Sequence, residues 1–234
     1  MRTASRPGQD LQGAVFAAAE AVRLSDLAEQ AIPGLQRAVG ASHALLYRYD
    51  DRGRLEPIAG NLVSTMNDYT GAMLMDDPLQ RAPLRMPPGP KVVLATREVD
   101  RDEYHRSMAY NEFYAPRDLE HVACTWLSTG KLYGEAGMTG LLLSRSAREE
   151  GFSPREVELL QQAMPAFVAA ARRSARIEET DRERGALEAL VSSGIPRALL
   201  ALDGSARLLW ISPSAEALLS PLLGRARALP DALS

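Results

Sequence analysis

The 234-residue sequence has one cysteine, three histidines and no long hydrophobic run. A single cysteine, Cys124, excludes an intrachain disulfide, so nothing indicates a secreted, oxidised scaffold, and a cytoplasmic location is expected. The longest apolar runs, such as residues 139–143, are strand-sized and fall short of the roughly 18–20 residues that a membrane span needs. The first ten residues lack the apolar segment of a signal peptide. We therefore expect no membrane segment and no membrane partner.

An excess of charge of one sign is also missing. The chain has 27 basic and 30 acidic residues, which gives a formal net charge of −3. This balance provides no general attraction for nucleic acid or anionic lipid, so these residues are not expected to contact DNA themselves. With 46% hydrophobic residues, the composition is that of a globular protein of one or two domains.

Common enzyme signatures are missing too. The sequence contains no Walker loop, no His-Glu-x-x-His, no Gly-x-Ser-x-Gly and no Gly-x-Gly-x-x-Gly. One cysteine cannot supply the attacking and resolving pair of a thiol reductase. His121 and Cys124 are three residues apart on a predicted strand, so they point to opposite faces and cannot share a metal ion. We predict no enzyme activity, no catalytic residue, no metal site and no cofactor.

Hydrophobic periodicity and turn residues predict an α+β chain in which an antiparallel sheet is flanked by helices. Helices are expected over 11–39, with a break or kink at Pro33-Gly34, and over 62–75, 100–114 and from 154 onward. Strands are expected over 44–49, 55–59, 121–128 and 138–144, with a proline-rich loop at 82–90 and a turn at 130–137 between them. A second hairpin over 198–212 and a helix from 213 follow, and this last unit is expected to be only part of a domain.

The helix after residue 153 has the clearest start signal. Ser153 and Glu156 form a capping-box pattern around Pro154. An apolar stripe (157, 160, 164, 167 and 171) either covers the sheet or forms a dimer seam, and one helix can do both. Residues 172–184 carry charges of both signs and are typical of a connecting helix. A homodimer is expected.

Three strings resemble a known family. They are Tyr110-Asn111-Glu112-Phe113-Tyr114 followed by Pro116, then Glu120-His121-Val122, and then residues 151–160, Gly-Phe-Ser-Pro-Arg-Glu-Val-Glu-Leu-Leu. With the order of the elements, they resemble a GAF domain over residues 11–175, and more closely the GAF-type sensor regions of LuxR-family helix-turn-helix transcriptional regulators. Residues 187–219 resemble the opening of a PAS domain.

The resemblance implies a domain plan and a mechanism. Residues 1–10 would be a disordered N-terminus, 11–175 the GAF-like sensor, 176–190 a linker or signalling helix and 191–234 a partial PAS-like domain. A small-molecule effector would shift the population of sensor conformations, and DNA would be bound only by a domain that is not in this chain.

The resemblance also points to a pocket. Acyl-homoserine-lactone receptors of the same superfamily have an Asp-Pro pair near aromatic residues, and Tyr69 and Asp77-Pro78 stand here in a similar order. No tryptophan precedes Trp126, which disfavours a lactone but not another small molecule in the same place. Cyclic nucleotides are also disfavoured, because the Asn-Lys…Phe…Asp-Glu signature is missing.

Tyrosines on the helix 100–114 complete the candidate site, because a ligand pocket combines apolar walls with a few polar tips. The predicted ligand-binding residues are Tyr47, Tyr69, Asp77, Tyr104, Tyr110, Tyr114 and Trp126. Phe113 and Met108 are expected to be core residues. If the aromatic residues fill the cavity themselves, the domain is instead a ligand-free dimerisation or protein-interaction module. A chromophore or haem sensor, using Cys124 or His105, is a third alternative.

Overall fold

The computed structural model describes residues 7–49, 54–69, 71–80, 91–128, 138–192, 198, 200–202 and 208–223. The chain divides into two compact units, Met1–Thr180 and Asp181–Ser234. No helix of the described residues is long and apolar enough to cross a membrane.

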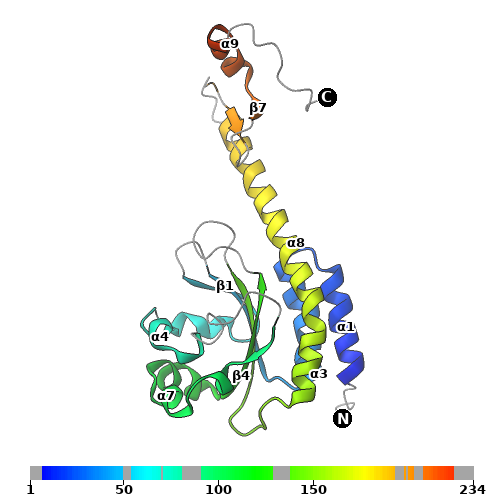
Figure 1. Cartoon of the computed structure of the whole chain (residues 1–234), viewed down its shortest axis with the longest axis vertical. Helices are drawn as coiled ribbons and strands as arrows, with labels where there is room; N and C mark the ends of the chain where they lie inside the picture. The colour runs from blue at the N-terminus through cyan, green and yellow to red at the C-terminus, as the bar shows by residue number, and fades with distance from the viewer. Residues whose placement is uncertain are drawn as a thin grey trace. The chain divides into compact units, whose positions relative to one another are not determined.

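The first unit is built on one antiparallel sheet (Figure 1). Its strands are β1 (His43–Tyr49), β2 (Leu55–Ala59), β3 (Val93–Leu94), β4 (His121–Ser128) and β5 (Thr139–Arg145), in the order β2-β1-β5-β4-β3. All seven residues of the central strand β5 are buried because both faces of the sheet are covered. The predicted α+β fold, an antiparallel sheet flanked by helices, is confirmed.

Alternation along the strands separates two hydrophobic cores. On β4, Ala123 and Leu127 face the first core, which the long helices cover. Val122, Cys124 and Trp126 face the second core, on the opposite side of the sheet. The candidate site lies in the second core.

The first core is covered by α1 (Pro7–Glu20), α2 (Leu24–Asp26), the π-helix η1 (Leu27–Ala31), α3 (Ile32–Val39) and α8 (Pro154–Ser192). Helix α1 begins at Pro7, so the prediction of disorder is wrong for residues 7–10. Proline is tolerated in a first helical turn, and Asp10 accepts a hydrogen bond from Nε of Arg37 at 2.9 Å. The predicted break at Pro33-Gly34 lies earlier in the chain, at the π-helix η1. Pro33 itself is in the first turn of α3.

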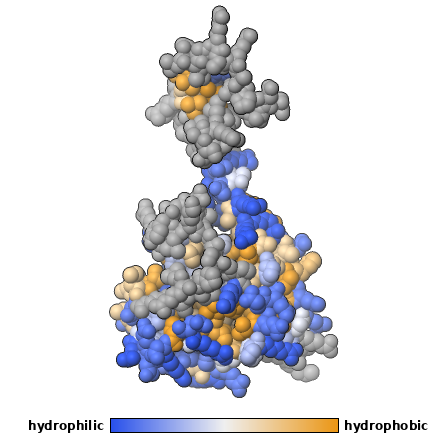
Figure 2. Space-filling view, viewed as in Figure 1, coloured by the Kyte–Doolittle hydropathy of each residue, from blue (hydrophilic) through white to orange (hydrophobic). Residues whose placement is uncertain are grey.

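Helix α8 starts as its capping pattern predicts. The Glu156 amide donates to Oγ of Ser153 at 3.3 Å, and the Ser153 amide donates to Oε2 of Glu156 at 2.7 Å. Of the predicted stripe, Leu160, Met164, Phe167 and Ala171 are buried in the first core. The stripe therefore packs within the chain, whereas the following part of α8, residues 172–185, is largely hydrophilic (Figure 2).

Short helices cover the second core. They are the 3₁₀-helix η2 (Val63–Asp68), α4 (Gly71–Asp76), α6 (Ala95–Glu98), α7 (Arg101–Arg106), the π-helix η3 (Tyr110–Tyr114) and the 3₁₀-helix η4 (Ala115–Arg117). The helices predicted over 62–75 and 100–114 are thus both interrupted. At Ser107 the backbone is extended, because its hydroxyl donates to the Tyr104 carbonyl at 2.7 Å and accepts from the Tyr110 amide at 3.1 Å. The predicted loop 82–90 and turn 130–137 lie outside the described residues.

The second unit contains the predicted hairpin and helix. Strands β6 (Leu200–Leu202) and β7 (Leu208–Ile211) pair in antiparallel fashion, and α9 (Pro213–Leu223) follows. The turn at Asp203-Gly204 lies outside the described residues. The PAS-like assignment of residues 191–234 stays a prediction.

Candidate functional site

The centre of the candidate site is the carboxylate of Asp77, which is fully buried. Asp77 lies between α4 and a short helical segment, residues 78–80. Its Oδ1 accepts a hydrogen bond from the Leu79 amide of that segment at 2.8 Å. Its Oδ2 accepts hydrogen bonds from the hydroxyls of Tyr69 at 2.6 Å and Tyr114 at 2.7 Å. The Gln80 side chain supplies a further hydrogen bond.

Burial sets the electrostatics of this cluster. Burial raises the pKa of Asp77 above its usual value, although the hydrogen bonds from Tyr69, Tyr114, Leu79 and Gln80 act in the opposite direction. The pKa values of Tyr69 and Tyr114 are also raised, first by burial and then by the negative charge of Asp77. Both hydroxyls therefore keep their protons and donate to the carboxylate.

A small cavity adjoins the two tyrosines. Apart from the amide of Gln80 and the three tyrosine hydroxyls, its wall is apolar: Leu45, Tyr47, Leu55, Leu62, Met66, Tyr69, Gln80, Phe113, Tyr114, Leu119 and Leu142. Its volume is about 20 Å³. That is room for roughly one water molecule.

The structure brings most of the predicted site residues together. Tyr47, Tyr69 and Tyr114 line the cavity, and Asp77 bonds to two of them. The ring of Trp126 is buried on β4, with its centroid 6.0 Å from that of Tyr47. Ligand binding by these residues stays a prediction.

Tyr104 and Tyr110 pack in the second core but do not line the cavity, and their hydroxyls bond to groups other than Asp77. Tyr104 is buried and donates to the Leu119 carbonyl at 3.4 Å. Tyr110 is turned away from Asp77, because its hydroxyl donates to Oε2 of Glu120 at 3.1 Å and its ring lies 4.4 Å from that of His105. Phe113 is a core residue as predicted, but Met108, which follows the break at Ser107, is 42% exposed.

Two residues of the cluster were missed by the sequence analysis. The hydroxyl of Tyr49 donates to Oε1 of Gln80 at 2.5 Å, so Gln80 connects Tyr49 to Asp77. Tyr49 had a usable signal, since it lies two positions from Tyr47 on the same predicted strand face. Gln80 stands beside a proline-rich loop and had none.

The chromophore and haem alternatives depended on Cys124 and His105. Burial and the charge of Asp77 raise the pKa of the Cys124 thiol to about 12, so the reactive thiolate is disfavoured. Nε2 of His105 lies 3.0 Å from Oε1 of Glu120. Among the described residues, no three histidine, cysteine or acidic side chains are grouped as a metal site.

No protein-family model and no curated protein matches the sequence. Among solved structures, the fold is similar to the VqsR LBD domain from Pseudomonas aeruginosa, with 14% identity and a TM-score of 0.53 over 72% of this chain and 96% of that chain. The N-acylhomoserine-lactone-dependent LuxR-family factor CepR2 from Burkholderia cenocepacia has 14% identity and a TM-score of 0.46, over 75% of this chain and 99% of that chain.

A GAF domain from an Acinetobacter phosphoenolpyruvate-protein phosphotransferase also has 14% identity, with a TM-score of 0.45 over 69% of this chain and 90% of that chain. Of these three, the VqsR LBD domain has the TM-score above 0.5, and the fold predicted as GAF-like is shared with it.

Proposed function

We propose that the first unit is a small-molecule-sensing domain of a LuxR-type transcriptional regulator. The observation that carries the proposal is the buried carboxylate of Asp77, held by two tyrosine hydroxyls beside an apolar, aromatic cavity. A buried ionisable group with a displaced pKa is costly, and such groups are concentrated at functional sites. The fold shared with the VqsR LBD domain supports a sensing role.

The chemistry of the cavity defines the ligand class. An apolar molecule with one N–H or O–H group would replace the hydrogen bond from Gln80 to Asp77 with its own and place its body against the leucine, methionine and aromatic side chains. Ligand pockets usually measure roughly 300–1,000 Å³, so the cavity of about 20 Å³ has to open. Leu55, Tyr69 and Gln80 are its partly buried wall residues and are expected to move first.

Opening provides the signal, since a ligand that binds only the open packing shifts the population toward it. Tyr47 lines the cavity, and the next residue on β1, Arg48, forms an ion pair with Glu178 of α8 at 3.2 Å. Displacement of Tyr47 is therefore expected to move α8. We propose that α8 relays this change, in a homodimer, to a DNA-binding domain outside this chain.

Native mass spectrometry of the protein purified from its host tests the proposal, because it reads oligomeric state and retained ligand together. We expect a dimer with extra mass that is released on denaturation. The extra mass should be lost in Asp77→Asn and retained in Asp76→Asn, the same change at the neighbouring exposed carboxylate. A protein without adduct and without a thermal shift across a metabolite panel would contradict small-molecule sensing.

One observation favours a second candidate, a ligand-free dimerisation or protein-interaction module. Side chains already fill the second core almost completely, and a cavity of about 20 Å³ remains beside Asp77. In that case the Asp77 cluster is structural. A dimer without adduct in the same experiment would support this alternative.

A further inference from the structure

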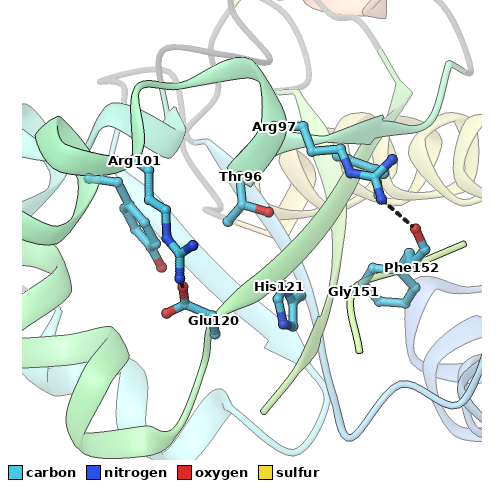
Figure 3. Close-up of a pocket in the computed structure, with 9 residues that line it drawn as sticks. Thr96, Arg97, Arg101, Glu120, His121, Gly151 and Phe152 are labelled. Carbon is cyan, nitrogen blue, oxygen red and sulfur yellow. Dashed lines mark hydrogen bonds and ion pairs between the residues drawn. The ribbon is translucent and has the colours of Figure 1, made fainter. Parts of the chain in front are cut away.

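A larger cleft lies on the surface, apart from the cavity at Asp77 (Figure 3). Its volume is about 300 Å³, which is large enough for a small ligand. Four chain segments meet around it: residues 94–97, residues 101–104, the junction of residues 120 and 121 at the start of β4, and residues 151–152 before α8. Tyr104 is the one predicted site residue that lines it.

Two guanidinium groups stand on different walls of this cleft (Figure 3). Nη2 of Arg97 donates to the Phe152 carbonyl at 3.0 Å. Arg101 forms an ion pair with Glu120, in which Nη2 lies 3.8 Å from Oε1, too far for a hydrogen bond, and the Arg101 side chain is 79% exposed. Among the described residues, the Arg97–Phe152 bond is the one hydrogen bond that these two guanidinium groups form, so their remaining N–H groups are open to a ligand.

The one carboxylate of the cleft is already engaged. Glu120 is hydrogen-bonded to Nε2 of His105 at 3.0 Å and to the Tyr110 hydroxyl at 3.1 Å. Its side chain is 12% exposed. Glu120 also forms a long ion pair with Arg101. Arg97 and Arg101 against this one carboxylate still leave the charged lining residues of the cleft with an excess of one positive charge.

The rest of the cleft suits an organic molecule rather than a bare ion. Partly buried Leu94 supplies apolar surface, and the nearly buried rings of Tyr104 and Phe152 form the wall behind it. The Thr96 hydroxyl accepts from the Val122 amide at 3.4 Å, so its own proton is available to a ligand. Guanidinium groups bind carboxylate and phosphate through paired hydrogen bonds.

We propose that this cleft is a second binding site, for a small organic anion. Its carboxylate or phosphate group binds Arg97 and Arg101, and its body packs on Leu94. The site requires no change at Asp77 and does not depend on the ligand proposed there.

An NMR titration of the 234-residue chain tests this site. The probes are benzoate for a carboxylate, inorganic phosphate for a phosphate, and benzyl alcohol as an uncharged match for benzoate, all at constant ionic strength. We expect benzoate or phosphate to give saturable shifts of backbone amides at 94–97, 120–121 and 151–152. Whichever anion binds more tightly identifies the preferred headgroup.

Variants locate the binding. Arg101→Gln is expected to raise the dissociation constant of the bound anion about tenfold or more, the loss expected for a charge-assisted contact. Arg97→Gln should act in the same direction. Arg106→Gln is the matched control, because Arg106 is exposed on the same helix, bonds to the Asp102 carbonyl and does not line the cleft.

Three results would overturn the proposal. They are the absence of saturable shifts with both anions, equal binding of benzyl alcohol and benzoate, and an equal loss of binding in Arg106→Gln and Arg101→Gln. Asp77→Asn should leave benzoate and phosphate titrations unchanged, so failure of the cleft and failure of the Asp77 site are distinguishable.

Discussion

Replacing Asp77 with asparagine is predicted to remove the loss of stability that occurs as this carboxyl ionises with rising pH. Burial raises the pKa of Asp77 in the folded protein above its usual 3.8. Between these two pKa values the folded state holds a proton that the unfolded chain has released. Stability from this group is therefore fully present below pH 3.8 and is lost as the pH rises through the folded pKa.

The size of the effect follows from linkage. One group contributes a slope of at most about 1.36 kcal/mol per pH unit while it titrates. Asparagine keeps an acceptor for the Leu79 amide and does not titrate. The free energy of unfolding of the wild type should therefore fall relative to that of Asp77→Asn as the pH rises from about 4, and the difference should level off above the folded pKa.

Tyr69→Phe tests in which direction the Tyr69 hydrogen bond shifts the pKa of Asp77. The Tyr69 hydroxyl bonds to Asp77 at 2.6 Å and lowers its pKa, so its removal should raise that pKa further and extend the sloping region to higher pH. Urea unfolding followed by circular dichroism at a series of pH values measures these differences. Carboxyls whose pKa values are lowered, such as Glu149, are present in every variant and cancel. A wild-type minus Asp77→Asn difference that is flat, or that rises with pH, would refute the reasoning.

Three other variants test the packing around the site. Arg145→Met should lower the free energy of unfolding by about 3–5 kcal/mol, because this buried guanidinium bonds to Glu156 and to backbone carbonyls, among them that of Gly40. Urea unfolding measures the loss, and an unchanged free energy of unfolding would contradict it. Gly140→Ala should displace the Tyr47 ring, which a Cβ would approach to 2.5 Å, and cost about 1–3 kcal/mol; an unchanged near-ultraviolet circular dichroism spectrum would contradict this. Ser153→Ala should cost about 0.5–2 kcal/mol in thermal unfolding through loss of the α8 cap, whereas Ser153→Asp should retain most of it.

Local signals predicted most of the fold. The strand His121–Ser128 has the predicted bounds, because its alternation is set by residues that are neighbours in sequence. The cap at Ser153 is also local, since both partners lie within four residues. The interruption at Ser107 was not predictable from hydrophobic spacing, because its cause is a hydroxyl that bonds to two backbone groups.

The candidate site was predicted in part for the same reason. Tyr69 and Asp77 were found through their order in the chain, and Tyr114 through the aromatic composition of its helix. Tyr110 was grouped with them on the assumption of one continuous α-helix, in which residues four apart share a face. The π-helical turn after Ser107 changes that spacing, and Tyr110 faces Glu120 instead.

Tyr104 therefore lies between the arginine cleft and the Asp77 cluster, a position that hydrophobic periodicity could not predict. Its ring lines the arginine cleft, and the same ring lies 5.8 Å from that of Tyr114, which bonds to Asp77. A ligand in either place acts on the other only if it prefers one position of this ring, and such an influence would be reciprocal in binding free energy. Because Tyr104 is 2% exposed and bonded to the Leu119 carbonyl, its ring cannot shift without disturbing the packing on both sides. Tyr104 is thus one residue that connects the two sites, beside the chain at Leu119, which lines the cavity, and Glu120, which lines the cleft.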